Sequence, residues 1–225
     1  MNLITASQLT RHCGYKRKLS KERPRSENAI KAQAKGSSFH ECAEVWLRGS
    51  EGPLPIDREV KGWVAWLRDI WTPPPGCTPE MPLGLSPEGR YVEVKEPEPH
   101  VYVPVVETPL LTAGRADVVW HHDGIAHVLD FKTGKFPVDA PKWNLQLLSL
   151  GFAAASFYGS DVMKVGIYYA RKGTFVWSDP IHLDSDEAAS MWGAVETAAT
   201  LDETPRPGPH CSRCWERKGC AFAAL

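Results

Sequence analysis

Two short segments on either side of an Asp-Gly pair constrain the fold of this chain most strongly. Residues 116–120 and 126–131 are rich in β-branched and aromatic side chains, a composition that favours β-strands. Asp123 and Gly124 lie between these segments, and an Asp-Gly pair is a strong signal for a two-residue hairpin turn. The sequence therefore predicts a β-hairpin in this stretch.

The register of that hairpin brings charged residues together. A two-residue turn would pair His122 with Ile125. In that register Asp117 faces Asp130, and Lys132 shares the face of Asp130 because strand side chains alternate. Facing acids destabilise a ladder unless a cation lies between them, so the group favours a divalent metal site. A four-residue turn would shift the register, and a pair of aspartates in a hairpin is more commonly solvated surface.

Length and composition are those of one domain with a sizeable core. The chain has 225 residues, of which 43% are hydrophobic. We expect four segments: a basic segment at 1–25, two helices within 26–72, a sheet core at 73–183, and a helix with clustered cysteines at 184–225. The element order predicts an α/β (α+β) fold with a central mixed β-sheet flanked by helices.

Periodicity and turn signals place the elements within these segments. Helical spacing is expected at 27–47, 56–71, 142–157 and 186–201, and strands at 101–134, 162–170 and 174–183. Asp184 or Ser185 is a plausible cap for the last helix.

The motif Gly114-Arg115-Ala116-Asp117, followed by Asp130-Phe131-Lys132-Thr133-Gly134, resembles the core of the PD-(D/E)XK nuclease superfamily. It most resembles the RecB-like, exonuclease V type branch. Further marks of that branch occur in its order: Gly36-x3-His40 with Glu44 one turn later, an isolated Glu80 (with Glu107 as its competitor), and Gln146 on a helix. The similarity spans about residues 7–222 and implies a restriction-endonuclease-like core. The branch often has Tyr a turn after Gln, where this chain has Leu150.

The resemblance implies a role for each matching residue. Asp117 and Asp130 would be ligands of Mg²⁺ or Mn²⁺, with the backbone carbonyl of Phe131 completing that side. Lys132 would orient or help deprotonate the attacking water, and Gln146 would hydrogen-bond near that water or the phosphate. The further metal contacts implied are His40, which biases the site towards Mn²⁺, and Glu80.

Six cysteines include a closely spaced set near the end of the chain: Cys13, Cys42, Cys77, Cys211, Cys214 and Cys220. Three thiolates at the Cys211-x2-Cys214-x5-Cys220 spacing commonly hold a metal or cluster and need a fourth ligand. The resemblance implies a 4Fe–4S cluster held by these three and Cys13, which would join the two ends of the chain. Zinc, with Cys13 or His210 as the fourth ligand, and free thiols are the alternatives.

Positive charge is concentrated in one segment, although the chain as a whole is nearly neutral. The net charge is −1, but residues 11–25 carry seven Lys or Arg against one Glu. We expect Lys16, Arg17, Lys18 and Arg115 to contact nucleic-acid phosphates. A solvated, partly flexible arm is the alternative for the basic segment.

These features predict a metal-dependent deoxyribonuclease acting on DNA ends or single strands in recombination or repair. A helicase or recombinase is a candidate protein partner. The beginning of the chain does not resemble a signal peptide, and no apolar run approaches a membrane span, so we expect a cytoplasmic protein. The alternatives are a nucleic-acid-binding or partner-scaffolding module with weak or absent catalysis, and a small zinc-binding protein.

Overall fold

The computed structural model describes residues 3–9, 26–50, 55, 57–135, 138–201, 204, 211 and 220. The helical elements are η1 (Ala6–Gln8), α2 (Glu27–Leu47), α3 (Arg58–Ile70), η2 (Pro141–Trp143), α4 (Leu145–Tyr158) and α5 (Asp186–Thr200). The strands are β1 (Thr78–Leu85), β2 (Tyr91–Val92), β3 (Val94–Glu98), β4 (Val101–Pro104), β5 (Thr112–His122), β6 (Ile125–Lys132), β7 (Val162–Tyr169), β8 (Thr174–Trp177) and β9 (Ile181–His182).

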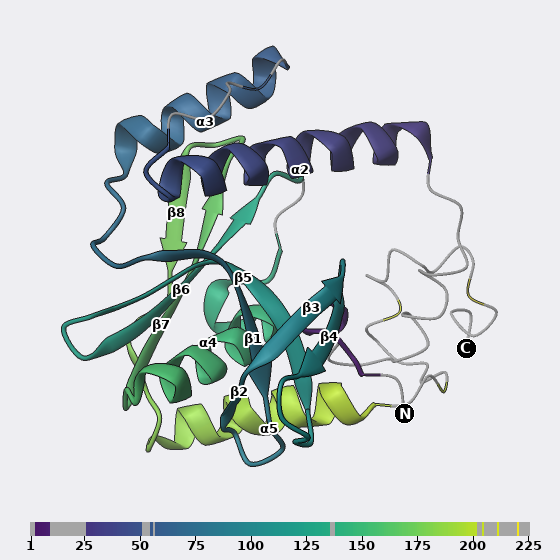
Figure 1. Ribbon diagram of the computed structural model, residues 1–225, viewed down its shortest axis with the longest axis vertical. Coiled ribbons are helices and arrows are strands. Elements are labelled where there is room, and N and C mark those ends of the chain that lie inside the picture. The colour runs from purple at the N-terminus through teal and green to yellow at the C-terminus, as the bar shows by residue number, and fades with distance from the viewer. Residues whose placement is uncertain are drawn as a thin grey trace.

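Seven strands form a central mixed sheet in the order β2-β1-β5-β6-β7-β8, with β9 also paired to β7. The β6–β7 pair is parallel and its neighbours are antiparallel. A parallel pair needs a crossover connection, and α4 supplies it. The strands β3 and β4 form a separate two-stranded ribbon that contacts β1 (Figure 1).

Helices cover both faces of this sheet. Figure 1 shows α2 and α3 on one side and α4 and α5 on the other. The α2–α3 side has a core that includes Phe39, Trp63 and Leu129. The α4–α5 side has a second core that includes Leu148 and Met191. The expected fold class, a mixed sheet flanked by helices, is therefore confirmed.

The hairpin between β5 and β6 has the predicted turn and register. Asp123 and Gly124 have φ values of 50° and 76°, the left-handed conformations of a two-residue hairpin turn. His122 pairs with Ile125, and the ladder continues in the same register to the pair Val118–Leu129. The next two residues in this register are Asp117 and Asp130, and the backbone pairing ends just before them.

Local signals set the ends of the helices. Ser26 caps α2 by accepting a hydrogen bond from Ala29 N, and Ser185 caps α5 in the same way. The expected helix 27–47 is observed with those bounds, whereas 56–71 is shortened to α3 because Asp57 caps it. None of the helices in the described ranges combines the length and apolar character that crossing a membrane requires.

One expected strand is split in two. Residues 174–183 form β8, which pairs with the second half of β7, and β9, which pairs with its first residues. Between them lies Pro180, which has no N–H to donate to a ladder. The sequence-based expectation of one continuous strand here was wrong for that reason.

Candidate metal centre

A cleft of about 660 Å³ opens where α2 crosses the ends of the central strands. Its walls come from α2, from β1, β5 and β6, and from the β3–β4 ribbon, with residues of η1 and α4 also contributing. The six residues implied as metal or catalytic side chains all line it: His40, Glu80, Asp117, Asp130, Lys132 and Gln146. His40 and Gln146, the first and last of them, are 106 residues apart in sequence, so it is the fold that brings these two into one cleft.

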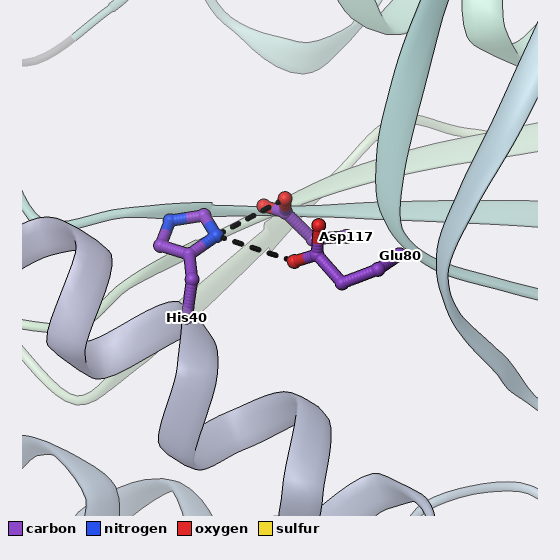
Figure 2. Close-up of side chains that lie close together, drawn as sticks. All are labelled: His40, Glu80 and Asp117. Carbon is purple, nitrogen blue, oxygen red and sulfur yellow. Dashed lines mark ion pairs between the residues drawn. The ribbon is translucent and has the colours of Figure 1, made fainter. Parts of the chain in front are cut away.

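Three of these side chains converge on one point (Figure 2). His40 extends from α2, with its Nδ1 3.2 Å from Asp117 Oδ1 and 3.7 Å from Glu80 Oε1. One ligand atom from each residue lies within 4.8 Å of the others. An imidazole nitrogen and two carboxylate oxygens can share one divalent cation at such spacing.

Glu80 reaches this point through an unusual backbone conformation. Its neighbours Pro79 and Met81 pair with Val118 and Ala116, which places Glu80 opposite Asp117. The φ of Glu80 is 53°, a left-handed conformation that costs a non-glycine residue roughly 1–2 kcal/mol. Strain of this kind is concentrated at functional sites, because surrounding structure must hold it in place.

Asp117 is fixed by a hydrogen bond to the neighbouring strand. Phe131 N donates to Asp117 Oδ2, so a side chain replaces the backbone acceptor where the β5–β6 ladder stops. The other oxygen, Oδ1, faces His40. One oxygen is thus used to hold the carboxylate, and the other is directed into the cleft.

Asp130, Lys132 and Gln146 form a second cluster beside the first. Lys132 Nζ lies 2.7 Å from Asp130 Oδ2, as expected for side chains on the same face of β6. Gln146, in the first turn of α4, connects the pair: its Nε2 donates to Asp130 Oδ1 at 3.3 Å, and its Oε1 accepts from Lys132 at 3.4 Å. Asn144 caps that turn by accepting from Leu147 N.

The pKa values of the two aspartates are shifted in opposite directions. Burial raises the pKa of Asp130, and the charge of Asp117 adds to this against the opposing effect of Lys132. Burial also acts on Asp117, but His40 and the Phe131 N–H outweigh it and hold the pKa of Asp117 below its usual value. Asp117 therefore keeps its negative charge to lower pH than Asp130 does.

Two basic groups are held in the charged form by these acids. Burial lowers the pKa of His40, but Asp117 and Glu80 together outweigh burial and raise it to about 10. Burial likewise opposes the charge of Lys132, yet Asp130 and Asp117 raise its pKa above the ordinary value. Without a metal, the His40 proton therefore neutralises the carboxylates that a cation would otherwise bind.

Gly36 and Gly114, two of the glycines in the matching motifs, are positions of close approach. A Cβ at Gly36 would lie 2.9 Å from Thr133 Oγ1, so glycine lets α2 pack against the loop after β6. A Cβ at Gly114 would lie 2.7 Å from the Cβ of Ala6, in η1. Gly36 stands one turn before His40, so its small size brings that imidazole within reach of Asp117.

The residues present fit a hard divalent cation. The donors are carboxylate oxygens and one imidazole nitrogen, the set that suits Mn²⁺ and, through the oxygens, Mg²⁺. Asp130 Oδ2 is buried and accepts no well-oriented hydrogen bond within the described part of the chain, although Lys132 lies beside it. Its carboxylate is thus incompletely satisfied at the edge of the same cleft.

Some of the remaining predicted residues line the cleft, some lie away from it, and some lie outside the described residues. Arg115 and Phe131 line the cleft, whereas Glu107, the competitor of Glu80, is exposed and does not line it. Leu150 is buried in the core beneath the sheet. Five further predicted residues lie outside the described residues: Cys13, Lys16, Arg17, Lys18 and Cys214. Cys211 and Cys220 are half-buried.

Sequence reasoning missed the contribution of the β3–β4 ribbon. Glu96, His100 and Tyr102 are placed at the site by this ribbon, and the last two line the cleft. An acid between a lysine and a proline resembles solvated surface in sequence, so no local pattern distinguishes Glu96. Its side chain is nevertheless 12% exposed.

Comparison with known proteins adds little to this geometry. No family model matches the chain, and no curated protein matches it. A solved structure described as the crystal structure of SSO0001 is similar at 14% identity, with 93% of this chain and 94% of that chain covered. Its TM-score of 0.37 is too low to support an argument, so the site rests on its own residues.

Proposed function

We propose that this protein is a Mg²⁺- or Mn²⁺-dependent deoxyribonuclease that acts on DNA ends or single strands. The observation that supports this most is the gathering of His40, Glu80 and Asp117 next to Asp130, Lys132 and Gln146 in one cleft. Acidic ligands beside a partly buried lysine are the groups that metal-assisted phosphodiester hydrolysis needs. A restriction-endonuclease-like core belongs to the same proposal.

The carboxylates and the imidazole would hold the ion. Asp117 and Glu80 each direct one oxygen towards His40 Nδ1, and Asp130 flanks them. When bound, the ion supplies a Lewis acid that lowers the pKa of water and offsets charge on a phosphate. The overall reaction adds water to phosphorus and breaks its bond to one sugar oxygen.

Lys132 and Gln146 would act on the water and the phosphate. The Lys132 ammonium is partly buried and held by Asp130, so it presents a fixed positive charge where a phosphate oxygen becomes more negative. Gln146 has both a donor and an acceptor in the same cluster, and it can orient a water molecule by exchanging one of its long hydrogen bonds.

Cleavage of end-labelled DNA tests the proposal. Purified protein should degrade single-stranded or blunt duplex DNA when Mg²⁺ or Mn²⁺ is added and should stop when the metal is chelated. Asp117→Asn and Lys132→Ala should each lower the rate by more than about 100-fold. Asp179→Asn and Lys61→Ala, at exposed positions, are the matched controls and should retain the wild-type rate.

A module that binds nucleic acid without cutting it is the competing function. It would bind labelled DNA in a metal-independent manner and show no cleavage on any substrate. Equal cleavage by wild type and Asp117→Asn would instead show that the activity arises elsewhere. The assay on single-stranded, blunt and nicked DNA also separates exonuclease from endonuclease action.

A 4Fe–4S cluster held by Cys13, Cys211, Cys214 and Cys220 is the second part of the proposal. It is supported by the spacing of the three C-terminal cysteines and by the N-terminal position of Cys13. Protein purified without oxygen should be brown and absorb in the visible range. A colourless sample with one zinc per chain would replace the cluster with the zinc alternative.

A further inference from the structure

Glu96 is a largely buried acid that does not belong to the central strands β1, β5 and β6. It lies on the β3–β4 ribbon, which forms a two-stranded sheet of its own beside the central sheet. Its side chain is only 12% exposed, although a carboxylate resists burial unless it is paired. The ribbon therefore places a charged group close to the metal centre.

Both oxygens of Glu96 have partners. Oε1 accepts a hydrogen bond from His100 N at 2.7 Å across the ribbon turn, where His100 has a φ of 64°. Oε2 lies 3.6 Å from Arg115 Nη1. Tyr102 also interacts with the carboxylate: burial, together with the charge of Glu96, raises the pKa of the tyrosine to about 12. The side chain of Glu96 is thus fixed from two strands.

Arg115 extends this contact to the metal centre. Its Nε lies 2.7 Å from Glu80 Oε2, while its Nη1 faces Glu96. Glu80 is held at Oε2 in this way, and its other oxygen, Oε1, faces His40. The guanidinium therefore links the ribbon acid to the strained acid of the central sheet.

We propose that Glu96 is a positioning residue for the metal centre: it holds Arg115, which in turn holds Glu80 with Oε1 directed at the cation position. The inference rests on the proposed function, because it assigns residues to the same metal site. Glu80 needs such support because its left-handed backbone interrupts the β1–β5 ladder. Outer partners that orient ligating groups commonly contribute 10–100-fold to metal affinity.

Mn²⁺ affinity, measured by the electron paramagnetic resonance signal of the free ion, tests the inference without any cleavage assay. Glu96→Ala should weaken Mn²⁺ binding by about tenfold or more. Glu96→Gln retains an acceptor for His100 N and should restore part of that loss. Tyr102→Phe removes only the hydroxyl and should have a smaller effect in the same direction. Glu98→Ala, at an exposed acid of the same strand, is the matched control.

The thermal midpoint without metal separates positioning from a structural role. The inference expects Glu96→Gln and Tyr102→Phe to keep the wild-type midpoint while losing Mn²⁺ affinity. If Glu96→Ala binds Mn²⁺ as tightly as Glu98→Ala, the inference is wrong and the proposed function stands. A wild-type protein that binds no Mn²⁺ overturns both. If Glu96→Ala does not fold, Tyr102→Phe decides, and wild-type affinity in that variant overturns the inference.

Discussion

Asp117 on β5 and Asp130 on β6 have the same side chain, nearly equal burial and opposite behaviour. They are 9% and 5% exposed, respectively. Asp117 contacts the His40 imidazole and accepts the Phe131 N–H, and its pKa is lowered. Asp130 has Lys132 and Gln146 as its partners, and its pKa is raised, mainly by burial.

This difference shows that partners decide which acid keeps its charge in a dry site. A hydrogen bond from the backbone and a cationic imidazole offset the loss of water around Asp117. Asp130 loses as much water and also feels the charge of Asp117. Divergent pKa values in neighbouring acids are a common arrangement at sites where one group must ligate and the other must exchange protons.

The largest effect that we expect concerns stability without metal. Asp117→Asn should lower the free energy of unfolding by up to about 3 kcal/mol, because the partly buried His40 charge loses its nearest partner. The double variant Asp130→Asn with Lys132→Met removes a whole ion pair and should change stability by less than about 1 kcal/mol. Urea unfolding in chelator measures both, and equal losses would contradict the asymmetry between the two acids.

Mn²⁺ binding should depend on pH because His40, the partner of Asp117, carries a proton that the ion must displace. The folded pKa of His40, about 10, lies above its ordinary 6.5. Its protonation therefore stabilises the metal-free fold most below pH 6.5, and this contribution is lost as pH rises towards 10. Binding must displace that proton, so Mn²⁺ affinity should rise by up to about tenfold per pH unit between pH 6.5 and 8.5.

Calorimetric titrations in buffers of different ionisation enthalpy would measure this proton release directly. His40→Gln should bind Mn²⁺ more weakly and with a flatter pH dependence. His122→Gln, at an exposed position of the β5–β6 hairpin, is the control and should retain the wild-type slope. An unchanged slope in His40→Gln would assign the released proton to another group.

Gly36→Ala should disturb the position of His40 beside Asp117 and leave the Asp130 cluster in place. The added Cβ would meet Thr133 Oγ1 and shift α2, which carries His40, at a cost of about 1–2 kcal/mol. We expect a corresponding loss of Mn²⁺ affinity of about tenfold. Adding Thr133→Ala should restore it, because the obstructing atom is removed. A double variant that binds as weakly as Gly36→Ala would contradict the steric explanation.

The smallest effect should come from the turn of the hairpin that carries both aspartates. Gly124 has a φ of 76°, so Gly124→Ala should cost about 1 kcal/mol of stability. The turn lies at the far end of β5 and β6 from the cleft, so Mn²⁺ affinity should stay unchanged. Thermal unfolding and Mn²⁺ titration of the same sample check the two statements, and a change in affinity would show that the strands move as a unit.

Much of the β5–β6 half of the site follows from local sequence. Asp-Gly fixes a two-residue turn, and the turn fixes the register that sets Asp117 opposite Asp130. Alternation of strand side chains then places Lys132 beside Asp130. These relations involve residues close in sequence, so short-range geometry is sufficient to derive them.

The rest of the site could not be derived in this way. His40 and Gln146 were identified only because the motif order of a resembling family includes them. Glu80 was poorly separated from Glu107 in sequence, because the left-handed bend that turns its carboxylate to Asp117 has no local signature. Glu96 was missed altogether, since its contact with Arg115 depends on how a separate ribbon packs beside β1.

The sequence by itself determined the hairpin, its register, the helix caps and the alternation that pairs Lys132 with Asp130, because each depends on backbone geometry over a few residues. Only the tertiary structure decided that His40 crosses to Asp117 and that Arg115 joins Glu96 to Glu80. Those contacts depend on the packing of α2 and of the β3–β4 ribbon against the sheet. The charge state of each buried acid follows from them, since a partner and not burial alone sets its pKa.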